Sequence, residues 1–342
     1  MTVTDRSTTP ARNTVPLLSV RDLKVQYMTA KAAVRAVDGV SFDIAPGEVL
    51  GLAGESGSGK STIAQSLLRI LNPPAVIAGG SITFQGRDIL AMSDTELEQF
   101  RWQELSMVFQ SAMNALNPVM TVGDQITDTI VSHKAMSPGQ AWKRAEELFD
   151  IVGIDPSRLR SYPHELSGGM RQRAVIAIAL ALQPPMMIMD EPTTALDVVV
   201  QKEIMQQIQD LKDEMGFSIL FITHDLSLLV EVSDRIAIMY AGQIVELAPA
   251  REIYERPLHP YTRGLLNSFP ALTGPKERVS GIPGSPPDMA APPSGCRFHP
   301  RCTQVRGFHK RLVPHLTEVE PGHFVACHLY TAPDGPPDGG PV

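Results

Sequence analysis

Gly54-Glu55-Ser56-Gly57-Ser58-Gly59-Lys60-Ser61-Thr62 is the stretch that decides the fold of this 342-residue chain. An apolar run of strand length, residues 48–53, precedes it, and residues 63–71, with apolar side chains at helical spacing, follow it. Glycines let such a loop turn its N–H groups toward an anion, and the helix N-terminus adds about half a positive charge. Lys60 can reach the β- and γ-phosphate oxygens, and Ser61 can ligate Mg²⁺. The stretch therefore predicts a nucleoside triphosphate site rather than a glycine-rich helix cap.

The composition is that of an ordinary globular protein, with 43% hydrophobic and 20% charged residues. The formal charge of −7 gives no electrostatic reason to expect nucleic acid as the main partner. No stretch approaches about 20 uninterrupted apolar residues, and the polar start contains no apolar secretory core. We therefore expect the chain to stay in the cytosol.

The first half of the chain divides into three parts. Residues 1–16 are predicted to be a disordered leader, and residues 17–27 and 34–44 alternate apolar with polar residues, which is typical of antiparallel strands. Residues 93–180 are richer in helix signals and predict a helical subdomain.

The second half begins with alternating strands and helices, which predict a parallel sheet with right-handed crossovers. The predicted elements are strands at 186–190, 218–223 and 235–240, with a helix at 198–214 and a short one after the second strand. After residue 255 the composition shifts to Pro and Gly, which predicts a small irregular extension over 256–342.

Two carboxylates, Asp190 and Glu191, end the apolar strand at 186–190. A magnesium nucleotide site needs such an arrangement beside the phosphate loop: Asp190 would hold the Mg²⁺ shell, and Glu191 could deprotonate the attacking water. A solvated acidic turn is the alternative. His224 follows the strand at 218–223 and is a candidate contact for the γ-phosphate.

A second anion site is predicted where Leu166-Ser167-Gly168-Gly169-Met170-Arg171-Gln172 opens a helix. The following residues, 174–182, are apolar nearly all round, so this helix must be buried. The chain therefore carries two anion-binding helix starts more than a hundred residues apart.

Taken together and in this order, these motifs resemble the ATP-binding subunit of an ABC transporter over about residues 17–270. The resemblance implies an α/β fold: a P-loop NTPase core of the ABC type with an antiparallel β-subdomain and a helical subdomain, together spanning 17–255. It implies ATP and Mg²⁺ as ligands and ATP hydrolysis as the activity.

The resemblance also assigns roles to single residues. Tyr27 corresponds to the aromatic residue that stacks on adenine, and Gln110 to the glutamine that senses Mg²⁺. Asp197 corresponds to the loop that crosses the dimer interface, and His224 to the switch histidine. The resemblance gives the same roles as above to the phosphate loop at residues 54–62, to Asp190 as the magnesium aspartate and to Glu191 as the catalytic carboxylate. Ser167, Gly168, Gly169 and Gln172 belong to the signature, in which Met170 stands where glutamine is commoner.

In this family the signature of one subunit closes over the ATP of another. The chain supplies one of each and contains no internal repeat, so the resemblance implies a second ATPase subunit, more often a paralogue than an identical copy. It also implies two membrane permease subunits, an extracytoplasmic solute-binding protein, and a peripheral position on the cytoplasmic face of the membrane. We expect residues 111–121, with exposed Met and Leu side chains, to contact the permease.

The tail, with His259-Pro260-Tyr261-Thr262 and Cys296-Arg297-Phe298-His299-Pro300-Arg301-Cys302, is similar to the tails of oligopeptide and dipeptide importer ATPases. Those tails usually carry four cysteines and are thought to hold an iron–sulfur cluster. Here Cys296, Cys302 and Cys327 correspond to three of them, and His309 stands in the place of the fourth. The set could hold a [4Fe-4S] cluster, form a Cys₃His zinc site, or remain three unligated cysteines.

Two functions from different classes follow. The first is an ATPase subunit that drives import of peptides or a related solute, such as nickel or oligosaccharides, which this chain alone does not distinguish. The second is a soluble ABC-type ATPase acting on nucleic acid or ribosomes. Such proteins fuse two ATPase units or insert a long coiled coil, and this sequence has neither feature.

Overall fold

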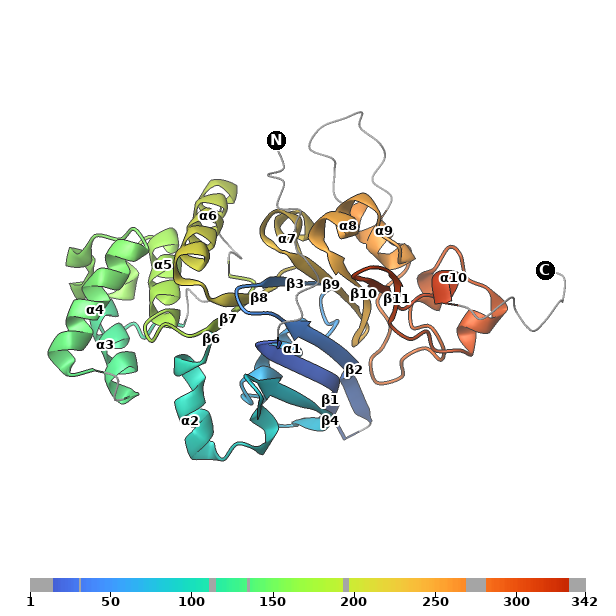
Figure 1. The fold of residues 1–342 in the computed structure, drawn as a ribbon, viewed down its shortest axis with the longest axis horizontal. Coiled ribbons are helices and arrows are strands. Elements are labelled where there is room, and N and C mark those ends of the chain that lie inside the picture. Colours follow the sequence, from blue (N-terminus) through green and yellow to red (C-terminus); the bar gives the residue numbers. More distant parts are fainter. Residues whose placement is uncertain are drawn as a thin grey trace.

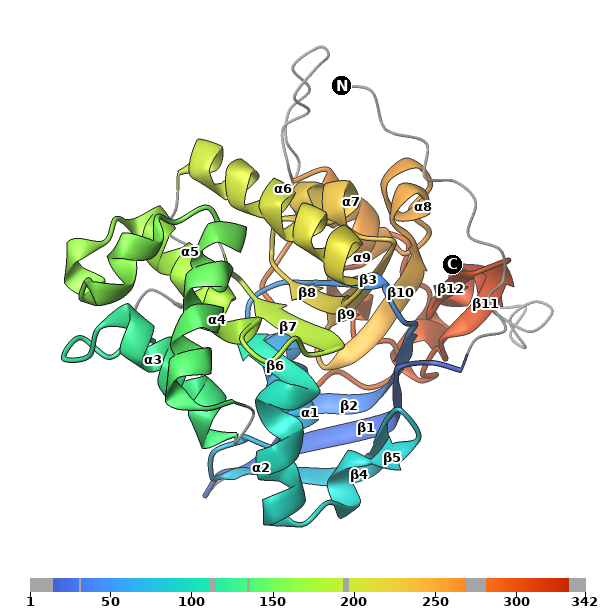
Figure 2. The ribbon, with the colours of Figure 1, turned by 60° about the vertical axis from the view of Figure 1, so that its left-hand side comes forward.

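The computed structural model describes residues 15–30, 32–110, 115–133, 136–192, 197–268 and 281–331. The predicted leader therefore lies almost entirely outside the described residues. Two sheets and a group of helices make up the described part of the chain, and Figures 1 and 2 show them from two sides.

The smaller sheet is antiparallel, with strand order β2-β1-β4-β5. Both alternating segments near the N-terminus form strands in it, as predicted. Its strands are β1 (Leu18–Met28), β2 (Ala33–Ile44), β4 (Ala75–Phe84) and β5 (Arg87–Asp88).

The larger sheet has eight strands in the order β11-β12-β10-β9-β3-β8-β7-β6. The five strands from β9 to β6 run parallel, as the alternation of strands and helices predicted. Every residue of β3, β7 and β8 is buried, which is typical of a parallel sheet covered on both faces. Its strands are β3 (Val49–Ala53), β6 (Leu105–Val108), β7 (Met186–Asp190), β8 (Ser218–Ile222), β9 (Arg235–Tyr240), β10 (Gln243–Pro249), β11 (Thr317–Glu320) and β12 (His323–Val325).

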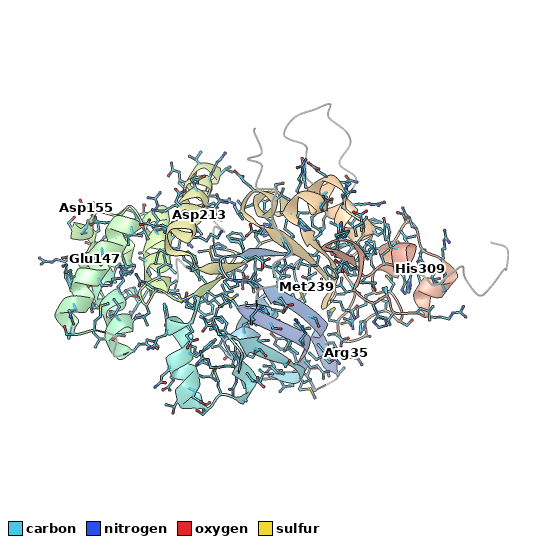
Figure 3. All side chains as sticks on the ribbon, in the orientation of Figure 1. Arg35, Glu147, Asp155, Asp213, Met239 and His309 are labelled. Atoms are coloured by element: carbon cyan, nitrogen blue, oxygen red, sulfur yellow. The ribbon has the colours of Figure 1, made fainter. Side chains whose placement is uncertain are left out.

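The two faces of the larger sheet belong to different hydrophobic cores. Leu50, Leu52 and Met239 pack with α1 (Lys60–Leu67) and the smaller sheet. The neighbouring Val49, Ala53 and other outward-facing strand residues pack with helices α5 (Gly168–Ala179), α6 (Val198–Met215) and α7 (Leu226–Val232). The helix α1 therefore lies between the two sheets, and side chains fill this region around Met239 in Figure 3.

Helices gather at one end of the molecule, at the left of Figures 1 and 2. Besides α5, this region contains α3 (Val122–Ser132) and α4 (Pro138–Ile151). Helix α2 (Asp94–Gln103) lies apart from them and packs against the smaller sheet, where Phe100 contacts Phe84. Short 3₁₀ helices, Pro156–Arg160 and Pro163–Glu165, lead from α4 to α5. The helix-rich middle section is thus present, although β6 interrupts it and belongs to the larger sheet.

Some of the residues after 255 are part of the main sheet. The strand β12 pairs with β10, and β11 pairs with β12, so the extension adds two strands to the main sheet. Composition did not indicate these short strands. Helix α8 (Ala250–Glu255) precedes the extension, which also contains α9 (Pro260–Leu266), α10 (His328–Thr331) and two 3₁₀ turns, His299–Arg301 and Gly307–Lys310.

Candidate nucleotide-binding and hydrolysis site

The predicted phosphate loop joins β3 to α1, between the two sheets. Gly54 and Gly59 both have positive φ angles, 151° and 107°. A Cβ atom at Gly54 would lie 2.2 Å from the Met239 carbonyl oxygen, and one at Gly59 would lie 2.2 Å from that of Ala36. Only glycine fits these positions, because each needs both the left-handed conformation and the close approach of another backbone segment.

Lys60 is buried and folded back over the loop. Its Nζ donates to the carbonyl oxygens of Gly54 at 2.8 Å and Glu55 at 3.0 Å. Burial lowers the pKa of Lys60, and the carboxylates of Glu191 and Asp190 oppose that shift. The ammonium group is therefore held at the centre of the loop, where an anion would neutralise it.

Tyr27 lies beside the loop, with its hydroxyl 3.4 Å from Oγ1 of Thr62. It stands near the end of β1, so the predicted adenine-stacking residue is close to the loop that would hold the phosphates.

Asp190 ends β7 and is only 3% exposed. Burial raises the pKa of its carboxyl group, although a hydrogen bond with Ser61 acts in the opposite direction. Its Oδ1 atom has no hydrogen-bond partner among the described residues. A buried carboxylate with an unsatisfied oxygen beside a serine hydroxyl fits Mg²⁺, which binds one or two carboxylates and hydroxyl or water oxygens.

Glu191 is the centre of a second cluster. Its Oε2 accepts a hydrogen bond from Nε2 of Gln110 at 2.9 Å, and its Oε1 lies 3.3 Å from Nδ1 of His224. Gln110 follows β6, Glu191 follows β7 and His224 follows β8, which are neighbouring parallel strands. Their carboxyl ends share one edge of the sheet, so three residues predicted from separate motifs come together.

The predicted signature forms the start of α5. Ser167 caps the helix, and its hydroxyl accepts a hydrogen bond from the Met170 backbone N–H at 3.3 Å. Ser167 is exposed, and Gly168 and Gly169 begin the helix. Gln172 is different, because it is only 2% exposed. Its side chain lies inside the protein, so the structure does not support a direct contact between Gln172 and a nucleotide at the exposed helix start.

Within one chain the signature and the phosphate loop belong to different regions. Figures 1 and 2 show α5 in the helical group and α1 between the two sheets. Asp197 is also near the surface: it caps α6 and accepts hydrogen bonds from the N–H groups of Val199 and Val200. The adjoining residues 195 and 196 lie outside the described residues.

Comparison with known proteins agrees with this geometry. A family model described as ABC transporter matches residues 37–194, and one described as oligopeptide/dipeptide transporter, C-terminal region, matches residues 245–307. A probable peptide ABC transporter ATP-binding protein of Sinorhizobium fredii is 46% identical over 91% of this chain and 94% of its own length. The oligopeptide transport ATP-binding protein OppD of Bacillus subtilis is 44% identical over 94% of this chain and 90% of its own.

The chain belongs to the ABC transporter family. A solved dimeric cassette, MJ0796 in a post-hydrolysis state with ADP and Pi, has a TM-score of 0.61 and 28% identity, covering 68% of this chain and 99% of that one. The fold is that of an ABC cassette, and the protein is an ABC-type ATPase. None of the helices in the described part of this ATPase is long and apolar enough to cross a membrane.

The segment expected to contact the permease is only partly described, because residues 111–114 lie outside the described residues. The expectation of an exposed leucine there is wrong: Leu116 is 5% exposed and belongs to the core. Among the described residues near this segment, Val119 and Phe109 have large exposed apolar side chains, at 78% and 42%.

Burial raises the pKa of the Cys327 thiol to about 11, and the charges of Cys296 and Cys302 act in the same direction. Among the described residues, the only group of three potential ligands with donor atoms within 4.8 Å of one another is Glu252, Glu320 and His323. The three sulfur atoms are therefore spread more widely. Arg256 pairs with both of those carboxylates, which accounts for that acidic group without a metal.

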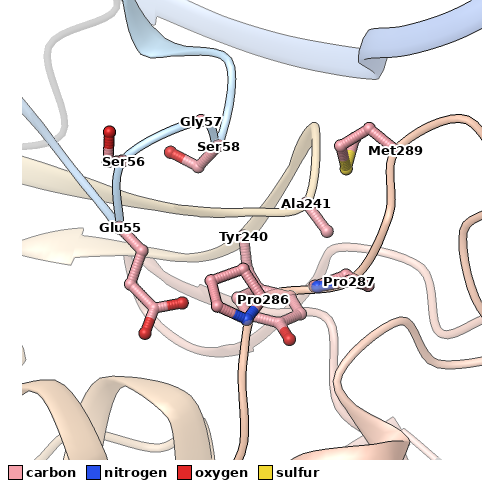
Figure 4. A pocket seen from close by; sticks show the side chains of 9 residues that line it. All are labelled: Glu55, Ser56, Gly57, Ser58, Tyr240, Ala241, Pro286, Pro287 and Met289. Atoms are coloured by element: carbon pink, nitrogen blue, oxygen red, sulfur yellow. The ribbon is translucent and has the colours of Figure 1, made fainter.

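The extension contacts the phosphate loop directly, which no motif indicated. Arg301 pairs with Glu55, and the hydroxyl of Tyr261 accepts a hydrogen bond from the Glu55 backbone N–H. A cavity of about 170 Å³ lies between the loop and the extension. Figure 4 shows Pro286, Pro287 and Met289 facing the loop across it. In the sequence, Arg301 and Tyr261 are only parts of the tail motifs, and nothing in those motifs indicates that both residues contact Glu55.

Proposed function

We propose that this ABC ATPase is the energy-coupling subunit of a membrane importer for peptides or a related solute. The observation that carries the proposal is the cluster of Gln110, Glu191 and His224 beside the phosphate loop, in a chain whose tail matches the oligopeptide/dipeptide transporter C-terminal region. The named relatives are peptide ABC transporter and oligopeptide transport ATP-binding proteins, which supports the peptide class.

In the proposed mechanism, the loop amides and Lys60 bind the β- and γ-phosphates. Glu191 accepts the proton of the attacking water, while Gln110 and His224 orient its carboxylate. Asp190 and Ser61 would hold Mg²⁺, which neutralises the charge that develops on the phosphates. The carboxylate of Glu191, which accepts the proton, is therefore already oriented by Gln110 and His224 before ATP binds.

The proposed active unit is a dimer of two ATPase subunits, in which Ser167, Gly168 and Gly169 of one subunit close over ATP held by the other. The separation of α5 from α1 within the chain supports this arrangement. The relative MJ0796 was solved as a dimer. We further propose that the second subunit is a paralogue, that two permease subunits and an extracytoplasmic solute-binding protein complete the importer, and that the ATPase is peripheral to the cytoplasmic face of the membrane.

The test is reconstitution. The ATPase is co-expressed with its permease subunits and its partner ATPase, and the complex is placed in liposomes with the solute-binding protein outside. Peptide should stimulate ATP hydrolysis and accumulate inside, whereas nickel or an oligosaccharide should not. Co-purification with ribosomes instead of integral membrane proteins would support the alternative function on nucleic acid or ribosomes. Peptide-independent hydrolysis would contradict the peptide assignment.

We also propose a metal centre in the tail, held by Cys296, Cys302, Cys327 and one imidazole. Thiolate and imidazole ligands suit both Zn²⁺ and an iron–sulfur cluster, so metal analysis has to distinguish a Cys₃His zinc site from a [4Fe-4S] cluster.

Two histidines compete for the imidazole position. His309 has a buried Nε2 without a partner among the described residues, but its Nδ1 accepts a hydrogen bond from the Arg306 N–H, which places the ring proton on Nε2. His299 has the opposite arrangement: its Nδ1 lies 2.9 Å from the Cys296 carbonyl oxygen, which can only accept, so Nε2 keeps its lone pair. Metal-bound histidines usually show this second pattern.

Iron, zinc and sulfide should be measured in anaerobically purified protein, with Cys302→Ser expected to lose the metal. Comparison of His309→Ala with His299→Ala then identifies the imidazole ligand by the loss of visible absorbance. Wild-type protein with neither iron nor zinc would contradict the metal centre.

A further inference from the structure

The phosphate loop is held from outside by the C-terminal extension. Glu55, the second residue of the loop, is bound through both its side chain and its backbone. Nη1 and Nη2 of Arg301 donate to Oε2 and Oε1 of Glu55 at 2.7 and 2.9 Å, and the Glu55 N–H donates to the Tyr261 hydroxyl at 2.9 Å. Such a two-pronged guanidinium–carboxylate pair fixes the direction of the carboxylate as well as its position.

Arg301 is itself held firmly. Its side chain is 5% exposed, whereas that of Glu55 is 26% exposed. Its Nε donates to the Pro283 carbonyl oxygen at 2.8 Å, and its guanidinium carbon lies 5.8 Å from the centre of the Tyr240 ring. A buried arginine with these contacts cannot swing away without breaking several of them, so the carboxylate of Glu55 has a fixed partner.

The contact is part of a wider seam between the extension and the loop. Tyr240, Tyr261 and Phe298 pack their rings together, with centroids 4.6 to 5.5 Å apart. Arg297 donates to the carbonyl oxygen of Ala241 and pairs with Asp38. The Gly242 N–H donates to the Ser58 carbonyl oxygen at 3.0 Å. The turn that follows β9 therefore contacts the phosphate loop through Gly242 and the extension through Ala241.

The charge of Glu55 makes this contact important for nucleotide binding. The loop must accept the polyphosphate of ATP, and a carboxylate within the same loop repels that anion unless a cation compensates it. Lys60, the cation inside the loop, is engaged with the loop carbonyls and is the group that an incoming phosphate needs. Arg301 is therefore the cation available to compensate Glu55 from outside.

We infer that Arg301 is a positioning residue for the phosphate loop, which neutralises Glu55 and holds its carboxylate away from the nucleotide, so that the C-terminal extension sets the affinity for ATP. Arg301 does not contact the reacting atoms in this arrangement. In this inference the extension acts on nucleotide binding through Glu55.

The experiment measures binding of ADP and of Mg²⁺-ATP to the purified full-length chain by calorimetry. Arg301→Met keeps most of the buried volume but removes the charge, and it should weaken binding of both nucleotides about tenfold, equivalent to about 1.4 kcal/mol. KM for ATP should rise in parallel while kcat changes little, because Gln110, Glu191 and His224 are untouched. Arg301→Lys retains the cation and should lose less affinity.

The decisive variant is the double substitution Glu55→Gln with Arg301→Met. If compensation of the Glu55 charge is the role of Arg301, removing that charge should restore most of the lost affinity. The matched control is Arg256→Ala, because Arg256 also joins the core to the extension, through Glu252 and Glu320, without contacting the loop. It should bind nucleotides like the wild type.

Wild-type affinity in Arg301→Met would overturn the inference, and so would a double variant as weak as the single one. Equal losses in Arg256→Ala and Arg301→Met would show that any loosening of the extension has the same effect, and would also overturn it. Melting temperatures confirm that each variant is folded. Nucleotide binding by the wild type tests the ATPase assignment separately, so the two conclusions can fail independently.

Discussion

Asp190 is a buried residue that suits Mg²⁺ binding but lowers the stability of the nucleotide-free protein. Its carboxyl group is 3% exposed, and burial raises its pKa. A carboxyl whose pKa is higher in the folded than in the unfolded state stabilises the fold below the unfolded value of 3.8, and that contribution is lost as the pH rises through the folded value. When it is ionised, Asp190 therefore destabilises the nucleotide-free protein.

Asp190→Asn should stabilise the nucleotide-free chain at neutral pH by about 1–3 kcal/mol, because a neutral amide replaces a buried charge with an unsatisfied oxygen. The gain should shrink as the pH is lowered and the wild-type carboxyl becomes protonated. Urea unfolding at several pH values measures it. The exposed Asp210→Asn should show no gain, and a destabilised Asp190→Asn would contradict this account. Mg²⁺-dependent ATP binding should be lost in the same variant.

Glu191→Gln should bind ATP but hydrolyse it about 100-fold more slowly or worse, because the amide cannot accept the proton of the attacking water. Phosphate release and nucleotide binding measured on the same sample separate the two effects. Glu214→Gln, on the exposed end of α6, is the control. Hydrolysis near the wild-type rate would show that another group accepts the proton.

At the level of secondary-structure elements, sequence reasoning predicted the central strands well and the extension poorly. Strand β7 has the bounds expected from its apolar run, because a strand buried on both faces has no room for polar residues. Strand β11 is mostly exposed and polar, so no pattern marks it. Glu191 and His224 were accessible because each follows a strand that the sequence predicted. Gln110 follows β6, which the sequence did not predict, and was assigned only through the family resemblance. The contact of Arg301 with Glu55 was not accessible, because the two residues are 246 positions apart and neither lies in a periodic pattern that indicates the other.

The start of α6 has the features of an interface. Val198 and Val199 are 80% and 68% exposed, directly after the capping residue Asp197. Adjacent exposed valines beside the predicted dimer loop indicate a surface that a second subunit covers.

Val198→Glu should weaken ATP-dependent dimerisation by about tenfold or more, because the charge would be desolvated at the interface. Size-exclusion chromatography with light scattering, in a Glu191→Gln background that retains ATP, measures it. The control is Val313→Glu in the extension, where the native side chain is 48% exposed. Unchanged dimerisation of Val198→Glu would place the interface elsewhere.

At the scale of the whole molecule, the phosphate loop and the signature lie in different regions of one chain. In the proposed dimer, each site therefore combines the loop of one subunit with the signature of the other. In purified protein that lacks the proposed paralogue, we expect two copies of this chain to form the dimer. Lys60→Ala removes the phosphate-binding function of one copy, and Ser167→Arg blocks the signature of the other. A dimer formed from the two variants has one intact combined site.

Each variant alone should therefore be inactive, and an equal mixture should regain up to about a quarter of the wild-type rate, since half of the dimers are mixed and each has one of two sites. The rate per chain should also rise with protein concentration. No recovery together with a concentration-independent wild-type rate would mean that a single chain hydrolyses ATP unaided.

The long reach from Glu55 to Arg301 gives the chain a defined order of maturation during synthesis. At about 5–20 residues per second, Arg301 is added roughly 12–50 s after Glu55, which lies 246 positions earlier. Throughout that interval the nascent nucleotide loop carries an uncompensated carboxylate, although both neighbours of β3, the strands β8 and β9, are synthesised before Arg301. If Arg301 sets the affinity for ATP, a growing polypeptide gains that affinity only after this residue has been added, near the end of translation.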